Sequence, residues 1–227
     1  MREHPLLMKG PLVRATLEGR KTQTRKPLRN QPPSGYHLVR VCGPWAEFEN
    51  DGPTLAKYST KSPLGEAGDR LWVRETWGIG ARPCPVEGGR EGIEYRADEG
   101  FQEDDISLLP LYSVDPPEGH TLDEYCKRGW RPSIHMPRWA CRLVLPLVSV
   151  RVERVQDITE EDAKAEGVER ISAGPGWECW TGYGPSSSCK TARDSFRSLW
   201  ISIYGEASWD ANPWVWVAEW DHAEVSK

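Results

Sequence analysis

The periodic segments of this sequence are short, and stretches rich in proline and glycine separate them. The 227 residues include 21 glycines and 19 prolines, which recur closely between residues 27 and 66 and again after residue 78. Short strands outnumber helices, and the two do not alternate as they do in parallel βαβ units. We therefore expect an α+β fold, a small β-barrel flanked by short helices, in a single domain over residues 1–227.

Three segments carry the signals of helices. Pro11 suits a first helical position and Gly19 suits a left-handed cap, which predicts a helix over 11–18. Thr159 precedes acidic residues in a capping pattern, which predicts a helix of about two turns. Residues 192–204 carry apolar side chains at positions i, i+3, i+4 and i+7, the pattern of an amphipathic helix.

Alternating apolar and polar residues predict strands at 37–42, after Gly68-Asp69, and at 140–145, 147–155 and 214–220. In the last of these, Ala218 and three tryptophans share one face, which we expect to pack in the core. The rest of 27–66 is expected to form loops. Residues 78–128 and 172–190 show little periodicity, which indicates two loop-rich insertions.

The charge of the chain limits its partners. Lys and Arg total 29 against 34 Asp and Glu, for a net charge of −5. This balance argues against strong, sequence-independent binding to duplex nucleic acid, which requires an extended basic surface. Twelve tryptophans against three phenylalanines make indole the preferred aromatic group, either as core filler or as a stacking surface.

The cysteines do not have the spacing of a metal site. All six lie at least ten residues apart, so we expect free thiols and no bound metal; a zinc site from Cys179, Cys189 and a distant His or Cys is the alternative. We also expect no cofactor. No apolar run approaches the roughly 18 residues that a membrane span requires, and no secretory segment is recognisable. We expect a cytoplasmic protein with no membrane partner.

The segment GRKTQTR, residues 19–25, has two interpretations. Lys21 and Thr24 are three residues apart, a spacing that brings them together on a helical turn but separates them on a strand. A lysine whose pKa is lowered by nearby cations can act as the base for a threonine nucleophile. The alternative is a group of solvated cations at the negative end of the preceding helix.

Two glutamates are further candidates. Glu75 lies on the apolar side of its predicted strand, whereas Arg74 lies on the other side. Glu75 is therefore expected either to meet a different arginine or to line a cavity. Glu166 lies near the end of the helix predicted after Thr159, where a solvated side chain is the alternative to a functional one.

The irregular segment SIHMPRWACR contains an imidazole, a guanidinium and an indole in His135, Arg138 and Trp139. Such side chains can hold a base by stacking and by hydrogen bonds to its edge, as recognition of a single strand requires. The alternative is a loop that Trp139 packs against the barrel. Trp77, at the end of its predicted strand, has the same two interpretations.

Four segments keep a consistent order along the chain: a helix followed by GRKTQTR, then GDRLWVRETW, then VERVQDITEEDAKAEGV, and finally WDANPWVWVAEW. Together they resemble the ASCH domain family of the PUA-like superfamily, in the tryptophan-rich form frequent in phages and prophages. The resemblance covers residues 5–26, 63–77, 131–170 and 192–220. It implies a PUA-like β-barrel with a cleft between the Gly-x-Lys-x-x-Thr segment and the helix that carries Glu166.

Small members of this family include amidohydrolases that remove the acetyl group from N(4)-acetylcytidine with a lysine, a threonine and a glutamate. The matching positions here are Lys21, Thr24 and Glu166. The family's arginine usually stands two residues after the threonine, whereas Arg25 follows it directly.

The resemblance implies a hydrolase that cleaves an amide on an exocyclic nitrogen of a modified base, nucleoside or nucleotide. The residues expected to bind the substrate are Arg25, Arg74, Glu75, Trp77, His135, Arg138, Trp139 and Asn212. Three alternatives stay open: a non-catalytic module that binds single-stranded RNA, an RNA-cleaving member, and a phage accessory protein without activity.

Overall fold

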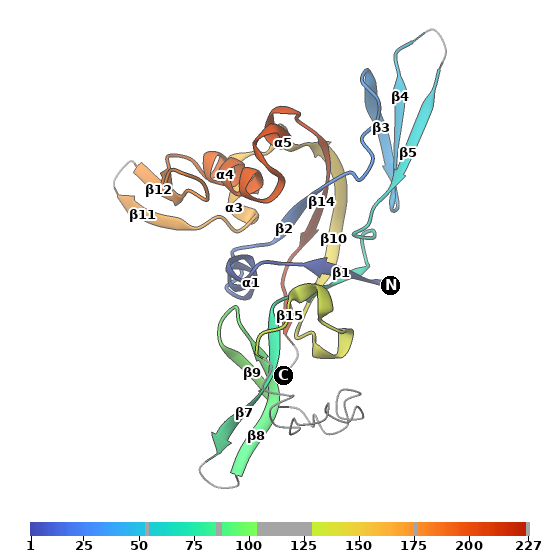
Figure 1. The fold of residues 1–227 in the computed structure, drawn as a ribbon. Helices are drawn as coiled ribbons and strands as arrows, with labels where there is room; N and C mark the ends of the chain where they lie inside the picture. Colours follow the sequence, from blue (N-terminus) through green and yellow to red (C-terminus); the bar gives the residue numbers. More distant parts are fainter. Residues whose placement is uncertain (53–54, 85–87, 104–128, 175–176, 226–227) are drawn as a thin grey trace, which may run out of the picture. The chain divides into compact units, whose positions relative to one another are not determined.

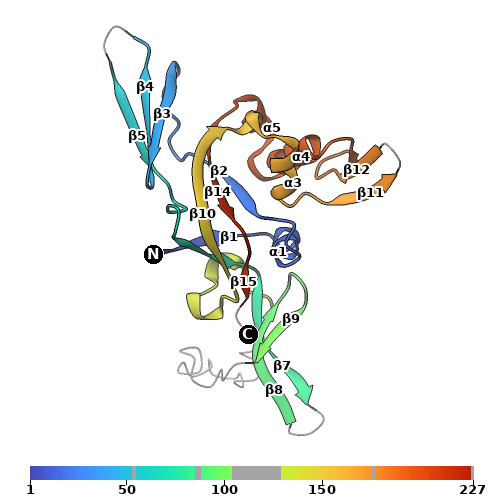
Figure 2. The same ribbon diagram turned by 180° about the vertical axis from the view of Figure 1, so that it is seen from behind.

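A computed structural model describes residues 1–52, 55–84, 88–103, 129–174 and 177–225, and these form a mixed α+β structure made mostly of strands (Figures 1 and 2). The contacts between residues divide the chain into two compact units. The larger unit comprises Met1–Pro5, Ala15–Leu71 and Val144–Glu224, and the smaller unit comprises Leu6–Arg14, Trp72–Leu143 and Val225–Lys227.

The main sheet has the strand order β1-β6-β10-β14-β2, and β15 pairs with β10. Its strands are β1 (Glu3–Leu7), β6 (Arg70–Arg74), β10 (Leu143–Arg154), β14 (Trp214–Trp220), β2 (Gln23–Pro27) and β15 (Glu224–Val225). Within the described residues no pairing joins β1 to β2, so the sheet is open along this path. The closed barrel expected from the sequence stays a prediction.

Three further sheets have three antiparallel strands each, in the orders β3-β4-β5, β7-β8-β9 and β11-β12-β13. Their bounds are Tyr36–Cys42, Trp45–Asn50 and Lys57–Lys61; Trp77–Cys84, Gly88–Tyr95 and Gly100–Glu103; and Arg170–Gly174, Trp177–Thr181 and Ser188–Cys189.

These sheets correct the expectation of loops over most of 27–66 and in the two insertions. In the first of these sheets β4 alternates the buried Ala46 and Phe48 with charged residues, and Arg40 pairs with Glu47 across the hairpin at 2.9 Å. The glycines and prolines around the strands favoured the loop interpretation. Much of the first insertion, residues 104–128, lies outside the described part of the chain.

The helices are α1 (Gly10–Leu17), α3 (Glu160–Ala165), α4 (Ala192–Tyr204) and α5 (Glu206–Asp210), and 3-10 turns cover Ser133–His135, Arg138–Ala140 and Val155–Asp157. The first three helices confirm the sequence prediction. The side chains of Thr159 and Thr191 accept hydrogen bonds from the first turns of α3 and α4. No helix in the described part is both long and apolar enough to cross a membrane.

The central strands β10 and β14 differ from the prediction in two ways. The strands predicted at 140–145 and 147–155 form one strand, Leu143–Arg154, which passes through Pro146 and has an irregularity in register between Leu147 and Ser149. In β14 both faces are buried, because Val215 and Val217 are as inaccessible as Trp216. An internal strand covered on both sides does not show the one-sided burial that its alternation predicts.

The sheet face opposite the tryptophans is covered by helices. In the larger unit Val217 pairs with Arg25 of β2 and with Arg151 of β10, which places these two arginines on one face. The Arg25 guanidinium lies 5.8 Å from the ring centre of Phe196 in α4. Figures 1 and 2 both show α3 and α4 side by side. A layer of charged side chains therefore lies between this sheet face and these helices.

Candidate active site

The Lys21 side chain is buried and fully hydrogen-bonded. It is 2% exposed, and its Nζ donates to Glu166 Oε2 at 2.9 Å, to the Glu166 carbonyl at 2.9 Å and to the Gln23 carbonyl at 2.7 Å. Residues 21 and 166 also form an isolated backbone bridge. An ammonium group has three hydrogens, so each one has an acceptor here.

Arg25 extends this contact into a network of carboxylates. Its Nη1 lies 3.1 Å from Glu166 Oε1, its Nη2 lies 2.9 Å from Asp162 Oδ2, and its Nε donates to Glu153 Oε1 at 3.0 Å. Glu166 thus holds Lys21 with one carboxylate oxygen and Arg25 with the other. We call Lys21, Arg25, Glu153, Asp162 and Glu166 the lysine cluster.

The two cations of the lysine cluster respond differently to burial. Burial lowers the pKa of Lys21, and Arg25 adds to that effect, whereas the carboxylate of Glu166 opposes it. The carboxylates around Arg25 outweigh its burial and raise the pKa of its guanidinium. Lys21 is therefore the cation of the cluster that gives up its proton more readily than a free lysine, whereas the arginine stays charged. Nearby, burial and then the charge of Glu166 raise the pKa of the Tyr204 phenol to about 12.

Two glycines allow the Lys21 backbone to approach α3. Gly19 follows α1 with φ +72°, and Gly167 follows α3 with φ +85°, both in the left-handed region. A Cβ on Gly167 would lie 2.7 Å from Lys21 Cβ and 3.0 Å from Ala15 Cβ. Glycine is therefore required at 167 by both backbone conformation and space.

The structure does not bring Thr24 to the lysine cluster. β2 begins at Gln23, and Thr24 pairs with Ala218 in β14. Successive strand residues face opposite sides, and the buried residues here are Lys21, Gln23 and Arg25, with half-buried threonines between them. Both residues are described, and no hydrogen bond joins Lys21 to Thr24. The extended backbone keeps apart the pair that a helical turn would bring together.

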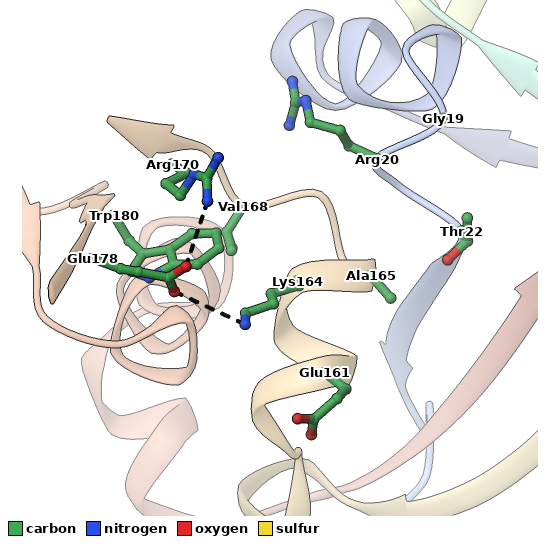
Figure 3. A pocket seen from close by; sticks show the side chains of 10 residues that line it. All are labelled: Gly19, Arg20, Thr22, Glu161, Lys164, Ala165, Val168, Arg170, Glu178 and Trp180. Atoms are coloured by element: carbon green, nitrogen blue, oxygen red, sulfur yellow. Dashed lines mark hydrogen bonds and ion pairs between the residues drawn. The ribbon is translucent and has the colours of Figure 1, made fainter. Parts of the chain in front are cut away.

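Two pockets lie beside the lysine cluster in the larger unit, and they share Thr22, Glu161 and Ala165. The first, of about 480 Å³, has three cations in its wall and is called the basic pocket; Figure 3 shows its lining, which includes Arg20, Lys164, Arg170, Glu178 and Trp180. The second, of about 360 Å³, is called the acidic pocket, and its wall includes Gln23, Asp162, Glu219, Trp220 and Asp221.

Glu75 meets an arginine within the smaller unit. Its two carboxylate oxygens accept hydrogen bonds from Arg142 Nε and Nη2, both at 3.0 Å. Asp98 binds the other side of the same guanidinium at 2.9 and 2.7 Å, and the Tyr95 ring lies 4.0 Å from it. Burial raises the pKa of Glu75. We call Glu75, Asp98 and Arg142 the arginine cluster, and it leaves Glu75 no free oxygen for a substrate.

Five other predicted binders also belong to the smaller unit. Trp77 is buried, and its ring centre lies 5.5 Å from that of Trp139, edge to face. Arg74 donates to the Ile134 carbonyl. His135 and Arg138 are exposed on neighbouring 3-10 turns. Trp77 is thus a packing residue, whereas the two turns present polar groups at the surface.

Asn212, the last predicted binder, has a structural role in the larger unit. It adopts φ +43° in the turn before β14. Its Oδ1 accepts a hydrogen bond from the Gln156 backbone N–H at 3.0 Å, and its carbonyl accepts one from Arg154 at 2.9 Å. Among the predicted substrate-binding residues, Arg25 is the one that the structure places in the lysine cluster.

Sequence reasoning missed several residues of the site, namely Gln23, Glu153, Asp162, Trp180, Tyr204 and Trp220. Two signals were available. The period of two in Lys-x-Gln-x-Arg places Gln23 on the face of Lys21 and Arg25. Asp162 and Glu166 are four residues apart at the end of a helix, a spacing that aligns their side chains.

The cysteines that the structure describes as free thiols are Cys42, Cys141, Cys179 and Cys189. Within the described residues, no group of three or more His, Cys, Asp or Glu side chains is arranged to hold a metal ion. Comparisons of the chain with protein-family profiles, with curated proteins and with solved structures found no match.

Proposed function

We propose that this chain is an ASCH-type hydrolase that cleaves an amide on an exocyclic nitrogen of a modified nucleobase, nucleoside or nucleotide, and that its main sheet is the core of a PUA-like barrel. The observation that carries the proposal is the 2.9 Å contact between Lys21 Nζ and Glu166 Oε2. These are two of the three catalytic positions that the family resemblance implies, and they meet across 145 residues of sequence beside two pockets.

The lysine cluster suits proton transfer. Burial disfavours the charged form of the Lys21 amine, and the 2.9 Å contact gives a short path for a proton from Lys21 to Glu166. The neutral amine then takes the proton of a threonine hydroxyl as that hydroxyl attacks the amide carbon. The C–N bond breaks, and Glu166 gives its proton to the leaving amine. Water finally cleaves the acyl ester, which releases a carboxylic acid and restores the hydroxyl.

The nucleophile assignment depends on which threonine reaches the substrate. The resemblance implies Thr24, but the residue that lines both pockets is Thr22, next to Lys21 in the chain. In Figure 3 the Thr22 side chain lies near Ala165 at the edge of the basic pocket. Thr22 and Thr24 both alternate with the buried Lys21, Gln23 and Arg25, so burial does not distinguish them. We take Thr22 as the candidate nucleophile because it lines both pockets, and Thr24 as the matched comparison.

The burial of Lys21 and Arg25 argues against the alternative of a non-catalytic module that holds phosphates with these residues. Lys21 is 2% and Arg25 is 5% exposed, and carboxylates already occupy both. A phosphate would have to displace these contacts to bind either cation. A buried lysine whose hydrogens all have acceptors is better suited to proton transfer than to anion binding.

The test is hydrolysis of a panel of N-acylated nucleosides, followed by release of the free nucleoside. We expect turnover of at least one member, a loss of about 10²- to 10⁴-fold for Glu166→Gln, and a larger loss for Thr22→Val than for Thr24→Val. A larger loss for Thr24→Val would return the nucleophile to the position implied by the resemblance. No turnover of any member by the wild-type protein would end the hydrolase proposal.

A further inference from the structure

The two pockets beside the lysine cluster differ in the charged residues of their walls. The acidic pocket has four carboxylate residues in its wall, Glu161, Asp162, Glu219 and Asp221, and no lysine or arginine. The basic pocket has Arg20, Lys164 and Arg170 against Glu161 and Glu178. A ligand that fills both pockets should therefore present hydrogen-bond donors at one end and an anion at the other.

The acidic pocket suits the amine end of a nucleobase. Asp162 and Glu219 already pair with Arg25 and Arg151. Glu161 and Asp221 are the wall carboxylates that these arginines do not occupy, and a carboxylate accepts a hydrogen bond from the exocyclic amine of cytosine. Gln23 and Trp220 also line this pocket. Lys21 is not in the wall of this pocket, but it contacts Trp220, which is: Trp220 Nε1 donates to the Lys21 carbonyl at 3.1 Å, and the Lys21 ammonium lies 5.9 Å from the Trp220 ring centre.

The basic pocket suits an anion. Figure 3 shows Lys164 and Arg170 both directed at Glu178, at 3.9 and 3.4 Å, with Arg20 on the segment that follows α1. One carboxylate is thus shared by two cations, and Arg20, the third cation of the wall, pairs with the exposed Glu18, its Nε donating to Glu18 Oε2 at 2.7 Å. All three side chains are substantially exposed, so a phosphate can reach them without breaking a buried contact.

The three cations of the basic pocket lie on a chain whose net charge is −5. A long polyanion would meet that net charge along its length, whereas a single phosphate meets the three cations of one pocket. The wall beside them is apolar where Val168 and Trp180 line it, which suits contact with a sugar.

We infer that the substrate of the proposed hydrolase is a nucleotide, whose 5′-phosphate is bound by Arg20, Lys164 and Arg170 in the basic pocket while its amine-bearing base occupies the acidic pocket. This inference rests on the proposed function for the chemistry at the base. The phosphate site itself can be tested without any turnover, because the unmodified nucleotide should bind to the same two pockets.

The experiment is calorimetric titration of the full chain with cytidine 5′-monophosphate, with cytidine and with inorganic phosphate. We expect the nucleotide to bind at least about tenfold more tightly than cytidine, since charge-assisted hydrogen bonds add to affinity. Raising the salt concentration should reduce this ratio. Arg170→Gln should reduce it several-fold, and Arg40→Gln, which removes an exposed arginine from the β3–β4 hairpin, should leave it unchanged.

The inference is overturned if cytidine binds as tightly as the nucleotide, if Arg170→Gln and Arg40→Gln have the same ratio, or if neither ligand binds. These outcomes are separate from those of the hydrolysis assay. Tight nucleotide binding without turnover of any acylated substrate would remove the proposed reaction but keep the phosphate site. Turnover of an acylated substrate with no preference for the nucleotide would keep the proposed reaction but remove the phosphate site.

Discussion

The lysine cluster of the larger unit and the arginine cluster of the smaller unit are both buried groups of charges, but they are built differently. In the arginine cluster one guanidinium is held by two carboxylates, Glu75 and Asp98, through four hydrogen bonds of 2.7 to 3.0 Å. In the lysine cluster one carboxylate, Glu166, is shared between a lysine and an arginine.

The difference lies in which proton can move. An arginine stays charged at any accessible pH, so two carboxylates around it form a fixed structural element. A buried lysine has a lowered pKa and can pass its proton to a partner. Two pockets adjoin the lysine cluster, and residues of that cluster or their sequence neighbours line them. Buried charge alone therefore does not identify a functional site. A buried lysine beside a pocket is a stronger indication of one.

The largest effect on stability is expected from Arg142→Met. It leaves Glu75, which is 1% exposed, without its partner, and we expect the free energy of unfolding to fall by about 3–5 kcal/mol. Urea denaturation measures this loss. The matched control is Arg40→Met, which breaks an exposed pair and should cost less than about 1 kcal/mol. Equal losses in the two variants would show that the arginine cluster is not structural.

Lys21→Met should cost less, about 1–3 kcal/mol. Glu166 keeps Arg25 as a partner at 3.1 Å, so no buried carboxylate is left without a cation. The same denaturation experiment gives the comparison. A loss for Lys21→Met that exceeds the loss for Arg142→Met would contradict the view that Lys21 is held for function rather than for stability.

Gly167→Ala tests the close packing of Lys21 against the end of α3. The new Cβ would lie 2.7 Å from Lys21 Cβ, whereas an alanine at Gly19, which also has positive φ, would have nothing within 4 Å. Both variants carry the backbone strain, but Gly167→Ala should be less stable than Gly19→Ala by about 1–3 kcal/mol. Similar losses would show that the backbone conformation, not the contact with Lys21, requires glycine at 167.

The pH dependence of stability should have opposite signs in the two clusters. Because the pKa of Lys21 is lowered, the unfolded chain binds more protons below the ordinary lysine value of 10.5, so this residue makes stability rise with pH up to that value. Because the pKa of Glu75 is raised, the folded chain binds more protons just above the ordinary value of 4.5, so stability falls as pH rises there.

These slopes are at most about 1.4 kcal/mol per pH unit for one proton. Comparing the wild-type protein with Lys21→Met at alkaline pH and with Glu75→Gln at mildly acidic pH isolates each contribution. Each substitution should remove the corresponding slope. Unchanged slopes in either variant would show that the pKa of that residue is not shifted by folding.

The fold was predictable where one local rule decides the structure. The helices Gly10–Leu17, Glu160–Ala165 and Ala192–Tyr204 have caps or one apolar face, and Trp214–Trp220 alternates regularly. Most strands of the three small sheets were not predicted, although β4 and β7 bury apolar residues at alternate positions, because the glycines and prolines around them favour loops. The burial of both faces of β14 depends on its tertiary packing, which its own alternation does not show.

The site was predictable in part, and for two different reasons. The contact between Lys21 and Glu166 followed from a family resemblance, since no local rule joins residues that far apart. The separation of Thr24 from Lys21 depends on whether the chain is extended or turned at that point, and the sequence left both possibilities open. Glu75 had to meet an arginine or a cavity, but its partner Arg142 is 67 residues away.

The most direct test of the difference between the clusters is the rate of hydrolysis of an N-acylated cytidine by the wild-type protein, Lys21→Met and Arg142→Met, each corrected for the fraction folded. We predict that Lys21→Met loses about 10²- to 10⁴-fold in kcat/KM, whereas Arg142→Met keeps the wild-type rate per folded molecule. Equal rates for Lys21→Met and the wild-type protein would contradict the account.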